Sequence, residues 1–122
     1  MNNFFLAASM ASAFTALLHL FLGGREIAAP LLKARDMRAV AKYTNYYCWH
    51  MVSIVLATMA AGYGWSAFRP QSTEIAVLFS FLALAFCVWN VLLVFWKKQH
   101  PLHMPQWILF AGIFLLSVPG FF

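Results

Sequence analysis

Four long apolar stretches that carry almost no charge constrain this chain more than any other feature. They run over residues 4–22, 46–67, 75–96 and 106–122. About 20 helical residues cross a hydrocarbon layer of about 30 Å, and each stretch approaches that length. The last is the shortest and contains Gly112, Pro119 and Gly120. The pattern predicts an all-α protein, an integral membrane four-helix antiparallel bundle that forms a single domain over residues 1–122.

The composition favours lipid as the solvent. Of the 122 residues, 64% are hydrophobic and 9% are charged, against about 45–50% and about 25% in an ordinary soluble domain. So short a chain has too little interior to hide that much apolar surface from water. The net charge of +5 comes from basic residues that flank the apolar stretches. This placement favours the headgroups of a lipid bilayer as partners and predicts no binding of nucleic acid.

The distribution of basic residues predicts the orientation of the chain. The second loop holds only Arg69, whereas the first and third loops hold seven basic residues: Arg25, Lys33, Arg35, Arg38, Lys42, Lys97 and Lys98. Because four spans place the first and third loops on the same side, the positive-inside rule predicts that both lie in the cytoplasm. We therefore expect a protein of the bacterial inner membrane with both termini outside the cytoplasm.

Two local patterns refine this arrangement. Residues 26–41 mix apolar and charged side chains, and Pro30 suits the first turn of a helix, so we expect a short amphipathic helix lying on the inner leaflet. Four tryptophans and all four tyrosines lie near predicted span ends. Amphipathic rings anchor a protein at the headgroups there. Tyr63 is therefore expected to be an interface anchor.

Stripes of small and polar residues run along the first three stretches at helical spacing. Helices that pack in lipid use such stripes, because close approach and interhelical hydrogen bonds replace the hydrophobic drive. We expect all three stripes to face the interior of the bundle. They consist of Ser12, Thr15, His19 and Glu26; of Tyr46, His50, Ser53, Ala57, Ala61 and Gly64; and of Ala76, Ser80, Ala83, Cys87 and Asn90.

His19, His50 and Asn90 fall at similar depth, toward the cytoplasmic ends of their stretches. We expect them to form one polar cluster inside the bundle, together with Tyr46 or Gln106. Ionisable groups at membrane depth are unfavourable and mark functional sites, and an imidazole with a pKa of about 6.5 exchanges protons at neutral pH. The hypothesis is that His50, His19 and Asn90 are catalytic. A hydrogen-bonded packing role for either histidine stays open.

Three classes of function remain open, and the sequence does not decide whether the chain is an enzyme. In the first, the cluster binds or acts on a lipophilic molecule from the inner leaflet, whose anionic head is held by Arg25, Arg35, Arg38 and Lys42. In the second, His19 and His50 ligate a transition metal or both axial positions of a haem, with Arg25 and Lys42 at the propionates. In the third, the chain is a non-catalytic accessory subunit of a larger membrane complex.

The entry to the second stretch carries a family resemblance. Lys42 and Asn45 resemble the basic residue and the asparagine that open the second helix of the MAPEG family, membrane proteins of eicosanoid and glutathione metabolism. The chain is also similar to that family in size, in four helices with an outside N-terminus, and in a long basic cytoplasmic loop. Where the family has a glutamate, this chain has Cys48. The resemblance implies a homo-oligomer, a trimer, with glutathione bound between subunits near Asn45 and Tyr46.

Overall fold

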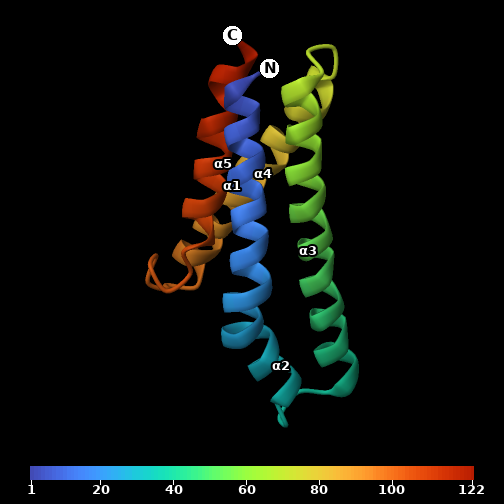
Figure 1. Cartoon of the computed structure of the whole chain (residues 1–122). Helices are drawn as coiled ribbons and strands as arrows, with labels where there is room; N and C mark the ends of the chain where they lie inside the picture. The colour runs from blue at the N-terminus through green and yellow to red at the C-terminus, as the bar shows by residue number, and fades with distance from the viewer.

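Helices form nearly the whole chain, and there are no β-strands. The computed structural model describes all 122 residues. In chain order the elements are α1 (Asn3–Leu18), η1 (His19–Ala28), α2 (Ala29–Lys33), α3 (Ala39–Phe68), α4 (Thr73–Trp96), α5 (Gln106–Ser117) and η2 (Val118–Phe121) (Figure 1). Because α1, η1 and α2 are continuous and η2 extends α5, the chain consists of four helical rods.

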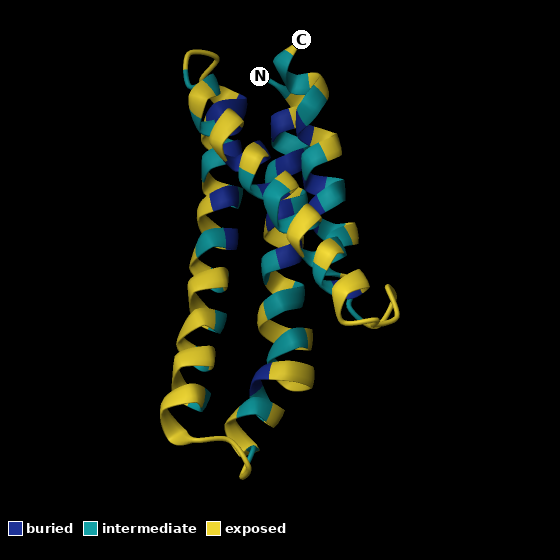
Figure 2. Ribbon diagram, turned by 180° about the vertical axis from the view of Figure 1, so that it is seen from behind, coloured by how far each residue is buried: buried dark blue, intermediate teal, exposed yellow.

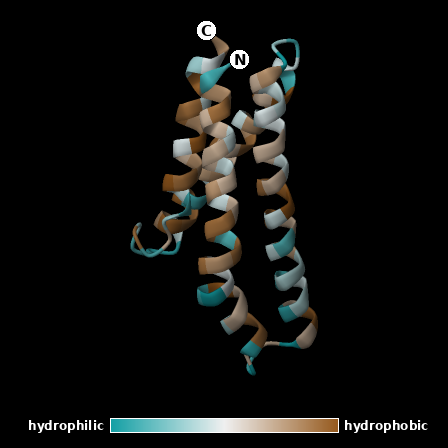
Figure 3. Ribbon diagram, viewed as in Figure 1, coloured by the Kyte–Doolittle hydropathy of each residue, from teal (hydrophilic) through white to brown (hydrophobic).

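Three of the four rods are long and apolar enough to cross a membrane. They are Asn3–Lys33 with 31 residues, Ala39–Phe68 with 30 and Thr73–Trp96 with 24. The fourth, Gln106–Phe121, is apolar but shorter. The predicted all-α class is confirmed, and each apolar stretch of the sequence is helical. Hydrophilic residues gather at the connections between the rods (Figure 3).

The rods differ in how far they reach. Both termini and the 69–72 connection lie at one end of the molecule, and the 34–38 connection lies at the other (Figure 1). The 97–105 connection ends well short of the 34–38 connection in both views (Figures 1 and 2). The molecule therefore has a four-helix half next to the termini. Beyond it, residues 19–55 form a two-helix extension, which we call the hairpin.

The buried core belongs to the four-helix half. Its members come from α1, the second half of α3, the first half of α4, and α5: Phe5, Ala8, Leu56, Met59, Tyr63, Ala67, Ala76, Phe79, Ala83, Phe110 and Ile113. Gly62 allows α3 to approach α4 here, because a Cβ atom at this position would overlap the Phe79 ring. In the hairpin, by contrast, Ala28 is the only buried residue (Figure 2).

A chain of hydroxyl groups links three helices inside this core. The Tyr63 hydroxyl lies 2.9 Å from Ser80 Oγ, and Ser80 Oγ lies 2.7 Å from Ser117 Oγ. Ser117 in turn donates to the carbonyl oxygen of Phe114 at 2.7 Å. Interhelical bonds of this kind hold α3, α4 and α5 together. The prediction that Tyr63 is an interface anchor is wrong, because its ring is fully buried and its hydroxyl is satisfied within the core.

The inward faces that the stripes predict are confirmed for α4 and wrong for α3. Ala76 and Ala83 of α4 are fully buried. On α3, Ala57 and Ala61 are exposed, and the buried face is centred on larger side chains such as Leu56. The reason is complementarity, since α1 and α4 bring small residues to the core. Leu56, Met59 and Tyr63 of α3 pack against these small residues, together with large side chains such as Phe5 and Phe110 from other helices.

The first stripe ends at His19 because the helix changes type there. Ser12 and Thr15 are buried, and each hydroxyl donates to the carbonyl four residues before it. Residues 19–28 form a π-helix, whose hydrogen bonds reach five residues back and so add a residue to each turn. A spacing of seven no longer places Glu26 on the same side as His19. Glu26 is accordingly exposed.

The first connection is shorter than the sequence predicts. α2 continues directly from η1, and Pro30 lies in its first turn, as expected. Because α3 begins at Ala39, only residues 34–38 are non-helical. The short helix predicted within residues 26–41 is present as α2, but it continues from η1 instead of standing apart from the first rod. Its place on the inner leaflet stays a prediction.

Candidate functional site

His19 lies at the start of η1 and faces α3. Its Nε2 atom lies 3.0 Å from the carbonyl oxygen of Trp49, and the two rings stack with centroids 3.9 Å apart. Because a carbonyl oxygen only accepts, the bond requires the proton on Nε2 and leaves Nδ1 as the acceptor of the neutral ring. Ser53 Oγ donates to the same carbonyl at 3.3 Å. His19 is thus fixed between the two helices of the hairpin.

Gly23 makes room for this arrangement. A Cβ atom at Gly23 would lie 2.7 Å from Cη2 of Trp49, so only the bare backbone of η1 fits against the indole. Sequence reasoning missed the π-helix and treated Trp49 as an anchor. The available signal was the pair Gly23 and Gly24, four and five residues after His19, because glycine lets a neighbouring group approach the backbone closely.

His50 follows Trp49 and therefore lies on a different face of α3. It is exposed, and the ring of Tyr46, one turn earlier, meets it edge to face with centroids 4.7 Å apart. Tyr46 was expected beside the histidines, and it lies beside His50. The hairpin thus carries two imidazoles in different surroundings, one fixed at the helix contact and one open to the outside.

Asn90 lies on α4, where that helix packs along α5. Its Oδ1 accepts the backbone N–H of Trp107 at 3.2 Å, and its Nδ2 donates to Gln106 Oε1 at 3.4 Å. Asn90 therefore caps the first turn of α5 from a neighbouring helix. The expected neighbour Gln106 is present, but no hydrogen bond joins Asn90 to His19 or His50. The residues predicted as one cluster fall into two polar groups.

The basic residues of the first loop surround the hairpin end. Lys42 is half-buried, and the others are exposed. Arg25 Nε pairs with Glu26 Oε1 at 3.0 Å, which is the only salt bridge in the chain. Asp36 has no such partner. Because residues 25–42 hold five basic side chains and two acidic ones, the hairpin end is positively charged.

A shallow groove of about 440 Å³ runs along the hairpin beside Trp49. It is open along its length and mostly apolar, and it is lined by Ile27, Leu31, Met37, Asn45, Cys48, Trp49 and Val52. The Asn45 amide donates to the Ala41 carbonyl at 2.8 Å, which leaves Oδ1 without a protein partner. Of the predicted binding residues, Asn45 lines the groove, and Arg38 adjoins Met37 in the chain.

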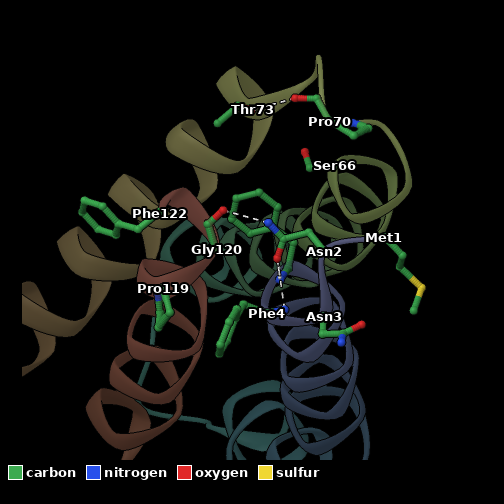
Figure 4. A pocket seen from close by; sticks show the side chains of 11 residues that line it. Met1, Asn2, Asn3, Phe4, Ser66, Pro70, Thr73, Pro119, Gly120 and Phe122 are labelled. Atoms are coloured by element: carbon green, nitrogen blue, oxygen red, sulfur yellow. Dashed lines mark hydrogen bonds between the residues drawn. The ribbon is translucent and has the colours of Figure 1, made fainter.

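A larger pocket of about 560 Å³ lies at the opposite end, between the two termini and the 69–72 connection (Figure 4). Asn2 is its central polar group. Its Oδ1 accepts the N–H groups of Phe4 and Phe5 at 3.1 Å, and its Nδ2 donates to the Gly120 carbonyl at 2.7 Å. No charged side chain lines the pocket. Because Asn2 is occupied in joining the chain ends, we place the candidate site at the hairpin.

Groups of metal-ligating side chains are sparse. No three His, Cys, Asp or Glu side chains come together. The rings of His100 and His103 lie 4.9 Å apart in the exposed 97–105 connection, where His100 Nδ1 accepts the Leu102 N–H at 3.2 Å. A metal or haem held by His19 and His50 alone would use His19 through Nδ1, because Nε2 is engaged. That site stays a prediction.

No protein-family model, curated protein or solved structure matches this chain. The resemblance to the MAPEG family, and with it the glutathione site, stays a prediction. The same holds for association with further copies or with a larger complex. The candidate site is therefore built on the hairpin geometry, in which Trp49 contacts His19 and also lines the groove.

Proposed function

We propose that this chain is an antiparallel four-helix bundle of the bacterial inner membrane, with both termini outside the cytoplasm. Three long apolar helices support insertion. The distribution of charge supports the orientation, because the 34–38 and 97–105 connections and their flanks hold all the basic residues except Arg69. The hairpin end then points toward the cytoplasm.

The helix lengths indicate where the hairpin lies relative to the lipid. A hydrocarbon layer of about 30 Å takes about 20 helical residues, whereas the first rod has 31 residues and α3 has 30. If both rods enter at the end near the termini, the surplus extends beyond the layer on the basic side. Arg25 and Lys42 then lie among the headgroups, and His19 and His50 lie near the hydrocarbon boundary.

The hairpin, in this proposal, binds a lipophilic molecule that enters from the inner leaflet. The observation that carries the proposal is the early end of the α4 and α5 pair (Figure 1), which leaves the hairpin without other helices beside it from the hydrocarbon boundary outward. A ligand can then reach the groove sideways, without an enclosed tunnel. His50 is the group placed to exchange a proton with it, because its ring is exposed. His19 positions Trp49.

Cysteine labelling tests the orientation. In a background with Cys48 and Cys87 replaced by serine, Asp36→Cys and Gln71→Cys place single thiols at opposite ends. A membrane-impermeant maleimide added to intact cells is expected to label Gln71→Cys at once and Asp36→Cys only after permeabilisation. The reverse pattern would refute the proposed orientation. Labelling of both positions from outside would refute the four-span topology.

Extraction of the detergent-purified protein tests the binding site. Organic extracts of the wild type, analysed by mass spectrometry, are expected to contain a lipophilic molecule in stoichiometric amount. Trp49→Ala removes the groove wall and is expected to lose it, whereas Trp89→Ala, at an exposed position on α4, is expected to keep it. Identical extracts from all three proteins would refute the hairpin as the binding site.

A further inference from the structure

We propose that the hairpin ligand is an anionic glycerophospholipid, with one acyl chain in the groove beside Trp49 and its phosphate where α3 begins. This assignment rests on the proposed function and names the chemical class of its ligand. It joins two features of the hairpin, an open apolar groove and an uncapped, positively charged helix start.

The groove fits a flexible chain better than a compact ligand. Six of its seven lining residues are hydrophobic, and its shape is shallow and open. A rigid ligand would leave much of its surface uncovered there, whereas an acyl chain can lie along the groove from the hydrocarbon boundary beside Trp49 toward Met37. Asn45 is the one polar lining side chain, and its free Oδ1 suits a hydroxyl or glycerol group.

The start of α3 favours an anion through its backbone. Arg38 is the cap residue, and α3 has neither a side-chain cap nor an acidic residue in its first turn. The N–H groups of Ala39, Val40 and Ala41 therefore lack intrahelical partners and lie at the positive end of the helix dipole. This helix start directly follows Met37, a lining residue of the groove.

Positively charged side chains at the start of α3 also favour an anion there. Arg38 lies at the helix start and Lys42 one turn later, where it is half-buried. Glu26 is paired with Arg25, and Asp36 is outnumbered by Lys33, Arg35, Arg38 and Lys42. A phosphate that carries a net negative charge is therefore favoured over a zwitterionic headgroup.

The 97–105 connection provides a contrast within the same molecule. It also has two cations, but Lys97 lies over the ring of Trp96, 4.0 Å from its centroid. The helix that follows it, α5, has its start capped by the Asn90 side chain at the Trp107 N–H. Lys97 and Lys98 therefore supply positive charge on the same side of the membrane without an uncapped helix start, which makes them the control.

The experiment measures lipid retention by native mass spectrometry. Purified protein is incubated with equal amounts of phosphatidylglycerol and phosphatidylcholine that carry identical acyl chains. The wild type is expected to retain phosphatidylglycerol in about fivefold excess or more. Arg38→Ala with Lys42→Ala should bring the ratio close to one, whereas Lys97→Ala with Lys98→Ala should leave it unchanged. Val52→Trp, which fills the groove, should lose both lipids, and circular dichroism checks that each variant is folded.

Each contrary result has a distinct meaning. Equal retention of both lipids by the wild type overturns the anionic class while leaving a lipophilic ligand at the hairpin. Equal loss of preference in the two double variants overturns the site at the start of α3, because charge alone would then explain it. Displacement by inorganic phosphate, or full retention by Val52→Trp, overturns the role of the acyl chain. Retention of no lipid, together with empty organic extracts, removes the proposed function as well.

Discussion

The two halves of α3 belong to one continuous helix, yet their surroundings differ completely. From Leu56 onward, its inner face is buried against α1, α4 and the hydroxyl chain. From Ala39 to Val55, no residue is buried, because α4 and α5 have already turned back (Figure 2). The number of neighbouring helices, rather than the apolar character of the helix itself, decides which side chains are fixed.

This difference separates stability from binding. A tightly packed segment resists change, and a segment with few buried contacts opens easily and accommodates ligands. In the hairpin, the contact of His19 with Trp49 takes the place of a buried core. The Trp49 ring is fixed and the other side of the groove is open, so the groove has a defined wall and stays accessible.

Two methionines, one in each half of α3, test the difference between the halves and give the largest expected change in the free energy of unfolding. Met59 is fully buried, whereas Met51 in the hairpin is 47% exposed. Met59→Ala is expected to lower the free energy of unfolding by about 2–3 kcal/mol, because a cavity forms that its neighbours only partly fill. Met51→Ala is expected to change it by about 0.5 kcal/mol or less. Unfolding by SDS in mixed micelles measures both, and equal losses would contradict the division of the molecule.

The contact between α3 and α4 allows a second test, in which a substitution adds volume to the core instead of removing it. Gly62→Ala inserts a methyl group into the space of the Phe79 ring, whereas Gly112→Ala meets nothing within 4 Å. Overpacking is expected to destabilise Gly62→Ala by about 1–3 kcal/mol. Gly112→Ala is expected to be neutral or stabilising, since alanine favours helix more than glycine does. The same unfolding assay decides, and a tolerated alanine at position 62 would mean that α3 and α4 are not in close contact.

The hydroxyl chain provides a smaller effect. Tyr63→Phe removes one hydroxyl but leaves Ser80 bonded to Ser117, so no buried polar group loses its last partner. The expected loss in the free energy of unfolding is about 0.6–1 kcal/mol. Tyr47→Phe, at an exposed position in the hairpin, is the control and should have no measurable effect. A loss above that range for Tyr63→Phe would indicate that the three hydroxyls act as a cooperative network.

Much of the fold followed from the sequence, because long apolar stretches satisfy their backbone hydrogen bonds most simply as helices. Apolar stretches of span length had to be helical, and the small residues of α4, such as Ala76 and Ala83, had to face other helices. The face of α3 could not be predicted in the same way. The buried face depends on the side chains that the neighbouring helices bring to the contact. Ala57 and Ala61 are small and have helical spacing, so the sequence alone does not distinguish their face from the buried one.

The candidate site was predictable in its residue types but not in its grouping. His19, His50 and Asn45 all lie in the hairpin, because each is close to the end of its apolar stretch, but His50 is exposed and not inside the bundle. Asn90 was placed with them on depth alone, and its separate role as the cap of α5 depends on lateral packing that spacing does not encode. The π-helix at residues 19–28 likewise depends on the fit of Gly23 against Trp49, which is a tertiary contact.

Two glutamates at opposite ends of the molecule give the smallest expected effects. Glu26 pairs with Arg25, but the two side chains are 60% and 75% exposed, so Glu26→Gln is expected to change the free energy of unfolding by less than about 0.5 kcal/mol. Glu74 has no salt-bridge partner, yet it lies in the first turn of α4, where a negative charge favours the helix dipole. Glu74→Gln is therefore expected to lose slightly more, about 0.3–1 kcal/mol at low salt. If Glu26→Gln proved the more damaging change, the hairpin end would have to be packed against something other than water and headgroups, and the contrast between the two halves of the molecule would fail.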